Sequence, residues 1–290
     1  SIDVAFTQWN ANIVRIPLTQ DIWFGYFKGQ KSAATAAAYQ KLVDSIVSRV
    51  SASNKYVLLD LHWSDGGVWG MHVGQHAMPD DNSVLFWKSV AKRYANNPAV
   101  LFDLYNEPHD VSWDVWKNGG AVEERNDDPA RGKHLMSHTP GMQALVNTVR
   151  AAGAKNIVIA GGLDWAYDLR GITSGNALTE RGGNGIMYAT HIYPWKKDWD
   201  LNVTPAASKY PVFVGEVGTK PWHEGDPPHE NVYTESWAPD VLKYIEKHDL
   251  SWTAWSLHPS ANPCLITGWD YKPTEYWGQY VKAALATRKN

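Results

Sequence analysis

The sequence has little of several features that mark common protein classes. It holds one cysteine, Cys264, so no disulfide can form within the chain. The formal net charge of -3 offers no basic surface for nucleic acid or an anionic membrane. No apolar run approaches the roughly 20 residues that cross a bilayer, and no glycine-rich phosphate-binding motif follows an apolar run. We therefore expect neither nucleic acid nor a membrane as partner, and the oligomeric state stays open.

Tryptophan, by contrast, is abundant, with 16 residues in a chain of 290. Flat aromatic rings complement the apolar faces of sugars through dispersion and hydrophobic contact. For any single tryptophan, core packing is the ordinary alternative; for the set, we favour a carbohydrate-binding surface. The tryptophans in polar surroundings rich in glycine and proline are Trp63, Trp69, Trp113, Trp116, Trp165, Trp195, Trp199, Trp222 and Trp269.

Short apolar runs alternate with helical patterns along the chain. The predicted strands are residues 13–17, 56–61, 100–105, 157–160, 187–191, 212–216 and 252–256. They are apolar on both faces, as parallel strands covered by helices should be. The alternation predicts either a (β/α) barrel or a doubly wound parallel sheet. Polar and aromatic residues follow many of these strands, which favours the TIM-type (β/α)8 barrel, here as one catalytic domain over residues 1–290.

The predicted barrel is one strand short, because only seven strands are visible. The chain opens on a helical pattern, Ile2, Ala5, Phe6 and Trp9, and a first strand should precede it. We therefore expect an N-terminally incomplete barrel. An upstream segment lost from this chain is the interpretation we favour; the alternative is an open barrel whose gap is covered by loops or a neighbouring molecule. Restoring a lost segment should raise thermal stability, because two sheet edges would gain hydrogen bonds.

Two of the predicted strands each deliver a glutamate at the carboxyl end. Residues 100–105 lead into Asn106-Glu107-Pro108, and a second apolar run leads into Gly215-Glu216. Two carboxyl groups that converge on one bond are the minimal equipment for hydrolysing a glycosidic bond. A strand-end glutamate on its own is often only an ion-pair partner, so the assignment of a catalytic role depends on the residues around the two glutamates.

Six segments, each at a strand end and in this order, give the chain a resemblance to glycoside hydrolase family 5, the cellulase-type barrel glycosidases. The resemblance runs from about Asn12 to about Tyr280 and departs from the family at the missing first strand. It implies a retaining mechanism, with Glu107 as acid/base and Glu216 as nucleophile. The matching segments are Asn12-Ile13-Val14-Arg15-Ile16-Pro17-Leu18, Leu59-Asp60-Leu61-His62-Trp63, Leu104-Tyr105-Asn106-Glu107-Pro108, His191-Ile192-Tyr193-Pro194, Val214-Gly215-Glu216 and Thr253-Ala254-Trp255-Ser256.

Such a pair places demands on its neighbours. Two carboxyls about 5–5.5 Å apart oppose each other's ionisation, so one pKa should rise. Glu107 must be protonated to donate to the leaving oxygen, and Glu216 must be charged to attack. Arg15 and Tyr193 are suitable donors to Glu216.

The remaining predicted site residues would bind substrate. Asn106 can hydrogen-bond the sugar 2-hydroxyl. His62 and His191 can bind hydroxyls or orient the glutamates, although each has the alternative of a satisfied core histidine. Trp255 can form the floor beneath the ring at the cleavage point, with Trp63 and Trp195 as further contacts.

A metal site is the less favoured interpretation of a second cluster. His72 and His76 are four residues apart with Asp80 and Asp81 nearby, a spacing that on a helix could present two nitrogens to a metal. Neighbouring glycines and a proline favour a loop instead, and hydrolysis by two carboxylates needs no metal. We predict no metal and no cofactor, and we interpret the charged run 123–128 as a solvated loop.

The sequence thus predicts a secreted, endo-acting β-1,4-glucanase that works by double displacement, with no signal peptide present in this chain. A β-mannanase or another β-glucanase of the same family is the alternative within the enzyme class. A carbohydrate-binding protein on a degenerate barrel is the alternative outside it.

Overall fold

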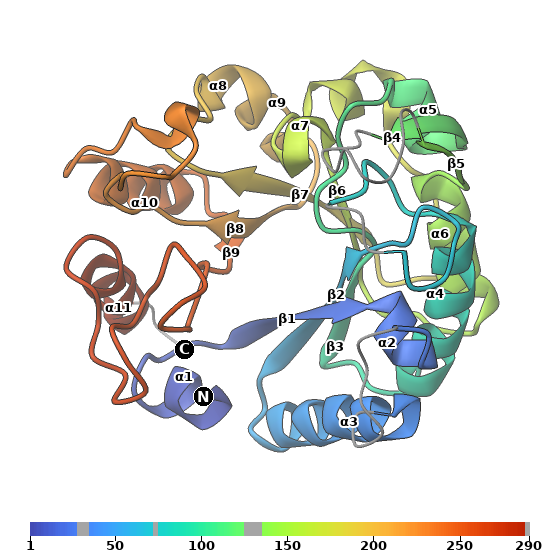
Figure 1. Cartoon of the computed structure of the whole chain (residues 1–290), viewed down its shortest axis with the longest axis horizontal. Coiled ribbons are helices and arrows are strands. Elements are labelled where there is room, and N and C mark those ends of the chain that lie inside the picture. Colours follow the sequence, from blue (N-terminus) through green and yellow to red (C-terminus); the bar gives the residue numbers. More distant parts are fainter. Residues whose placement is uncertain (28–34, 72–74, 125–134, 288–290) are drawn as a thin grey trace.

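The structure is a computed structural model that describes residues 1–27, 35–71, 75–124 and 135–287. Seven parallel strands form one curled sheet in the order β1-β2-β3-β6-β7-β8-β9 (Figure 1). The strands are β1 (Ile13–Thr19), β2 (Tyr56–Trp63), β3 (Val100–Asp103), β6 (Val158–Gly161), β7 (Ile186–Ile192), β8 (Val212–Val217) and β9 (Ser251–Trp252). The predicted fold is confirmed, including the seven visible strands.

Helices cover the outside of the curled sheet (Figure 1). Their apolar residues recur at helical spacing and face the strands, as Val43, Val47 and Val50 do in α3. The helices are α1 (Ile2–Thr7), α2 (Gln20–Phe24), α3 (Ala36–Ala52), α4 (Asp81–Tyr94), α5 (Trp113–Asn118), α6 (Met142–Ala151), α7 (Leu163–Ala166), α8 (Trp199–Asn202), α9 (Thr204–Ala207), α10 (Trp237–Lys247) and α11 (Gly278–Thr287). Among the described helices, none is both long and apolar enough to cross a membrane.

The sheet has a core on each face. The larger cluster lies between strands and helices, and a smaller one lies on the opposite face, built from Leu58, Leu101, Ile159, Ala189 and Phe213. Because side chains alternate along a strand, the residues two and four positions after Leu58 share its face. These residues are Asp60 and His62. β2 therefore contributes Leu58 to the smaller core and, nearer its carboxyl end on the same face, two polar side chains.

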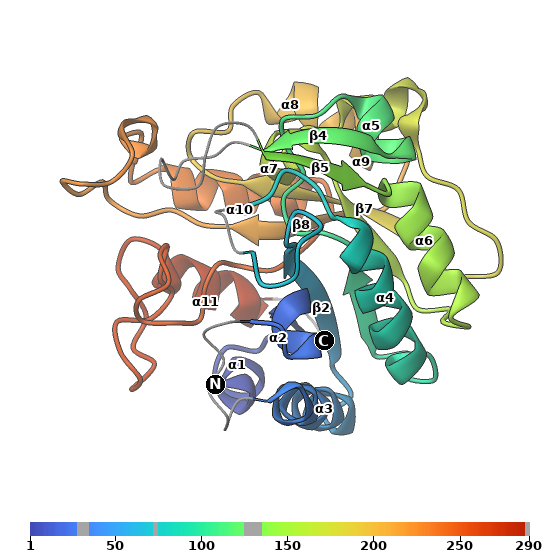
Figure 2. The ribbon, with the colours of Figure 1, turned by 45° about the vertical axis from the view of Figure 1, so that its right-hand side comes forward.

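The segment from Asp110 to Thr139 carries regular structure in its described part. It contains α5 and an antiparallel hairpin of β4 (Gly120–Glu124) and β5 (Leu135–Thr139). Figure 2 shows this hairpin beside α5. The turn from α5 into the hairpin needs glycine at position 119, where φ is +86° and an added Cβ would lie 2.5 Å from the Thr139 carbonyl oxygen.

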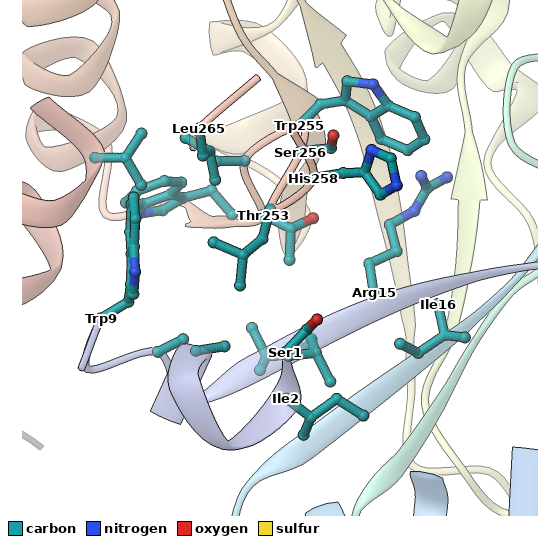
Figure 3. A pocket seen from close by; sticks show the side chains of 18 of the residues that line it. Ser1, Ile2, Trp9, Arg15, Ile16, Thr253, Trp255, Ser256, His258 and Leu265 are labelled. Atoms are coloured by element: carbon teal, nitrogen blue, oxygen red, sulfur yellow. The ribbon is translucent and has the colours of Figure 1, made fainter. Parts of the chain in front are cut away.

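The sheet ends at β1 and β9, and no described strand pairs with either outer edge. Between them lies an apolar groove of about 390 Å³. Figure 3 shows Trp9 at the left of this groove, Ser1 and Ile2 below it, and Trp255 and Arg15 at its right. The segment that follows α1 is tied to α11, because Asn10 Nδ2 donates to the Leu285 carbonyl oxygen at 2.8 Å.

β9 is shorter than predicted. The sequence suggested a strand over residues 252–256, but regular pairing stops at Trp252. Beyond it, Thr253 N donates to Val214 O at 2.9 Å and Trp255 N donates to Val217 O at 3.0 Å. The contact with β8 therefore continues in irregular form and carries Trp255 to the carboxyl end of the sheet.

Candidate active site

A cleft of about 890 Å³ opens at the carboxyl ends of the strands. Most of the sequence-predicted site residues line it, whereas Arg15 and His191 lie beneath its surface, both almost fully buried. The predicted residues on the cleft wall are His62, Trp63, Asn106, Glu107, Tyr193, Trp195, Glu216 and Trp255. Gln75, Lys196 and Lys220 line it too, and none of these three was predicted from the sequence.

Glu107 and Glu216 meet at the centre of this cleft. One carboxylate oxygen of each and a ring nitrogen of His191 all lie within 4.8 Å of one another. His191 Nδ1 is 2.8 Å from Glu107 Oε1 and 3.7 Å from Glu216 Oε2. A register shift between β7 and β8 sets His191 opposite Glu216. Gly215 permits this approach, because a Cβ there would lie 2.7 Å from His191 Nε2.

Two donors stabilise the charge of Glu216, which is only 5% exposed. Arg15 Nη1 donates to Oε1 at 2.8 Å, and the Tyr193 hydroxyl donates to Oε2 at 2.6 Å. Burial, with the neighbouring Glu216 carboxylate, raises the pKa of Tyr193 well above its usual range, so the phenol keeps its proton for this bond. The structure thus brings both predicted donors to the predicted nucleophile.

Arg15 also contacts two buried aspartates, neither of which was a predicted site residue. Its Nη2 lies 3.1 Å from Asp60 Oδ2 and 3.0 Å from Asp103 Oδ2. Asp60 and Asp103 are directly opposite each other on β2 and β3. Burial raises the pKa of Asp103 to about 7, even though the Arg15 charge opposes the shift. An aspartate inside each of two otherwise apolar strands was the available sequence signal.

Glu107 has both carboxylate oxygens engaged. His191 Nδ1 is near Oε1, and Gln75 Nε2 donates to Oε2 at 2.7 Å. Burial alone would raise the pKa of Glu107, but the hydrogen bonds from His191 and Gln75 outweigh it and lower the pKa. The pKa of Glu107 in the free protein is therefore lowered, because hydrogen bonds to the charged form and the charge of His191 exceed desolvation.

Aromatic rings frame the pair. The His62 ring stacks on Trp255 with centroids 5.6 Å apart, and its Nδ1 lies 2.7 Å from Asp60 Oδ2. Tyr193 and Trp195 stack at 5.0 Å. Trp63 is 41% exposed on the same wall.

The tryptophans chosen for their polar surroundings divide between two roles. Trp63, Trp165, Trp195 and Trp222 line the cleft, and their role as a carbohydrate-binding surface stays a prediction. Trp116 does not; it is fully buried and donates Nε1 to the Gly161 carbonyl oxygen at 2.9 Å. Core packing is the correct interpretation for that residue.

The described members of the second histidine cluster do not gather at one site. His76 is buried with Nδ1 3.3 Å from Glu124 Oε2, and Asp80 caps α4 by accepting from Ser83 N. Asp81 lies beside His138 instead, and His72 lies outside the described residues. The charged run 123–128 was wrongly interpreted as wholly solvated, because Glu124 is buried against His76; residues 125–128 lie outside the described part. In the described residues, the grouping with metal-like spacing is Glu107, His191 and Glu216.

Comparison with known proteins identifies the family to which this chain is similar. The model named Cellulase (glycosyl hydrolase family 5) matches residues 1–261. Endoglucanase MaCel5A of Microbulbifer sp. (strain ALW1) is 25% identical over 304 residues, which covers 99% of this chain and 51% of that protein. Endoglucanase E-5 of Thermobifida fusca is 22% identical over 301 residues, covering 98% and 55%. The chain thus spans about half the length of these curated relatives.

Solved structures show the same fold. The β-glucanase SdGluc5_26A from Saccharophagus degradans matches with a TM-score of 0.75 at 24% identity, covering 98% of this chain and 81% of that one. A second structure of that enzyme, in complex with cellotetraose, matches with the same TM-score at 23% identity.

Proposed function

Because the chain belongs to glycosyl hydrolase family 5, we propose that it is an endo-acting β-1,4-glucanase that hydrolyses cellulose-type chains with retention of configuration. We further propose that residues 1–290 act as one catalytic domain, with Glu107 as acid/base and Glu216 as nucleophile. The names of its relatives, endoglucanases and a β-glucanase, favour a β-glucan over a β-mannan.

The close approach of the two carboxylates carries this proposal. An oxygen of Glu107 and one of Glu216 lie within 4.8 Å. Retaining glycosidases hold their carboxyl groups about 5–5.5 Å apart, whereas inverting enzymes need about 6.5–9.5 Å to admit a water between carboxylate and sugar. The separation therefore favours direct attack by one glutamate on the sugar.

Two displacements follow from this geometry. A Glu216 oxygen bonds the anomeric carbon while the glycosidic C–O bond breaks, and Glu107 gives its proton to the departing oxygen. Glu107, now a carboxylate, then takes a proton from water as that water attacks the anomeric carbon and releases Glu216. Arg15 and Tyr193 stabilise Glu216 when it is charged, before attack and after release.

The other predicted residues bind the sugar. Arg15 Nη2 donates to Asn106 Oδ1 at 2.8 Å, which leaves the amide nitrogen of Asn106 as the donor to a 2-hydroxyl. Trp255, held by its stack with His62, provides the floor. His191 orients Glu107, and Trp63 and Trp195 offer ring faces along the cleft. A polymeric substrate of this kind is degraded outside the cell, so we propose a secreted protein.

A substrate panel tests the proposal. The protein is incubated separately with carboxymethylcellulose, mixed-linkage glucan, xyloglucan, mannan and xylan. Chromatography gives the lengths of the products, and proton NMR identifies the anomer that is released first. We expect fastest cleavage of a β-1,4-glucan, internal cuts, and first release of the β-anomer. Glu216→Gln should abolish turnover, because the amide cannot form the covalent intermediate.

Three other outcomes would contradict parts of the proposal. Preferred cleavage of mannan would indicate a β-mannanase, and first release of the α-anomer would contradict retention of configuration. Binding without cleavage would indicate a carbohydrate-binding protein.

A further inference from the structure

Gln75 contacts the oxygen through which Glu107 has to act. Of the two carboxylate oxygens, Oε1 faces the fully buried His191, so a proton reaches the substrate only from Oε2. Gln75 Nε2 donates to that oxygen at 2.7 Å, and Gln75 lines the cleft. We propose that Gln75 is a positioning residue of the acid/base: it holds Glu107 as a carboxylate in the free protein and leaves Oε2 when substrate binds. This inference rests on the proposed function.

The fold fixes the backbone next to Gln75. The neighbouring His76 is buried against Glu124 of β4, and its carbonyl oxygen accepts from the Tyr105 hydroxyl at 2.6 Å. Ala77 N donates to Glu124 Oε2 at 3.1 Å. The hairpin that follows the Glu107 strand therefore anchors the chain one residue from Gln75. Only the Gln75 side chain, half-buried at the cleft wall, has to move for Oε2 to be released.

A glutamine suits this position because its side-chain amide can face Glu107 in two orientations, and each orientation suits one protonation state of Glu107. The NH₂ group donates to a carboxylate, and the carbonyl oxygen accepts from a carboxylic acid. Beside Oε2 in the structure, the NH₂ group faces Glu107 and stabilises its charge. Protonation of Glu107 at Oε2 therefore removes the acceptor for the NH₂ group in this orientation, and the departing sugar oxygen can then take its place as the partner of Oε2.

The effect of Gln75 can be separated from that of its charged neighbours. Glu107 faces His191 from β7, Glu216 from β8 and His62 from β2, with Tyr193 and Arg15 acting through Glu216. Gln75 carries no charge, so replacing it with methionine of similar length removes only a hydrogen bond. A bond to a charged acceptor is worth about 1.5–3 kcal/mol, which corresponds to a pKa change of about one to two units. Losing it should raise the pKa of Glu107 by at least about one unit.

The pH dependences of kcat/KM and kcat distinguish a positioning role of Gln75 from a purely structural one. The kcat/KM profile reports the free enzyme and the kcat profile reports the enzyme–substrate complex. In Gln75→Met we expect the alkaline limb of kcat/KM to move up by about one pH unit. The alkaline limb of kcat should stay in place, because Gln75 has left Oε2 in the complex. Gln143→Met is the matched control, since Gln143 is half-buried on α6 like Gln75, and its amide nitrogen donates to Asn147 Oδ1 and to the Thr179 carbonyl oxygen.

A direct titration keeps the test independent of activity. Carboxyl-carbon NMR of protein labelled with [δ-¹³C]glutamate, with Glu107 assigned by Glu107→Gln, gives the Glu107 titration without substrate. An upward shift in Gln75→Met but not in Gln143→Met supports the inference. No shift, or equal displacement of the kcat and kcat/KM limbs, would overturn it. A shifted titration in a protein that cleaves none of the polysaccharides would refute the proposed function while supporting the Gln75–Glu107 hydrogen bond.

Discussion

Replacing Arg15 with methionine should reveal how strongly the site depends on one buried charge. The Arg15 side chain is 4% exposed and lies 2.8–3.1 Å from Asp60, Asp103 and Glu216. Methionine retains much of the apolar stem but no charge. Removing one partner of a buried ion pair costs about 3–5 kcal/mol, because the other charge stays buried without compensation. We expect Arg15→Met to lose at least about 3 kcal/mol of unfolding free energy at pH 7.

The loss should depend on pH in a defined direction. Without Arg15, the buried carboxyls that it faced hold protons that the unfolded chain releases above about pH 4. The folded variant then binds more protons than the unfolded chain, so its stability falls as pH rises. The deficit relative to the unmodified protein should therefore shrink between pH 7 and pH 5.

Urea unfolding followed by tryptophan fluorescence at pH 5, 6, 7 and 8 measures both effects. Arg93→Met is the matched control, because Arg93 pairs with Asp44 at the surface, with both side chains 38% exposed. Exposed pairs contribute about 0.2–1 kcal/mol, so a small loss without a trend over this pH range is expected. Arg15→Lys restores the charge without the planar fork and should fall between the two. Equal losses in Arg15→Met and Arg93→Met, or a deficit that is the same at pH 5 and pH 7, would refute the reasoning.

Three further predictions concern the same site. Glu107→Ala should lose most activity on polysaccharides but still be glycosylated quickly by aryl glycosides with activated leaving groups, measured as a burst; equal loss on both would contradict its role as acid. The pKa of Asp103, raised from 3.8 to about 7, implies that stability is lost as pH rises through that window, by on the order of 4 kcal/mol at most. Asp103→Asn should flatten that decline in unfolding experiments, and an unchanged slope would assign it to other groups. A chelator should leave kcat unchanged, whereas strong inhibition would indicate a metal held by Glu107, His191 and Glu216.

The sheet and the glutamate pair were predictable because they follow from local patterns. Apolar runs placed the strands, and the carboxyl ends of neighbouring parallel strands must share one edge. Glu107 and Glu216 therefore had to lie on the same side of the sheet. Their neighbours Arg15 and Tyr193 could be predicted for the same reason, since each also stands on or just after a strand.

The groups that set the charge balance could not be predicted in this way. Asp60 and Asp103 lie within apolar strands, and only the pairing of β2 with β3 sets them opposite each other under Arg15. Gln75 comes from a loop whose position depends on the contact between His76 and Glu124, which are far apart in the sequence. Neither periodicity nor spacing encodes such contacts.

The same contacts explain how an edge strand can hold a central site residue. The described part of the sheet leaves the outer edge of β1 unpaired beside the apolar groove, so backbone pairing fixes β1 only through β2. Arg15 adds ion pairs to β3, through Asp103, and to β8, through Glu216. Because β8 is not a hydrogen-bonded neighbour of β1, the Arg15–Glu216 pair crosses the inside of the curled sheet. One guanidinium therefore stabilises the carboxylate of Glu216 and also ties the open edge to the opposite strands, so the geometry of the site depends on this ion-pair network as well as on the backbone ladder.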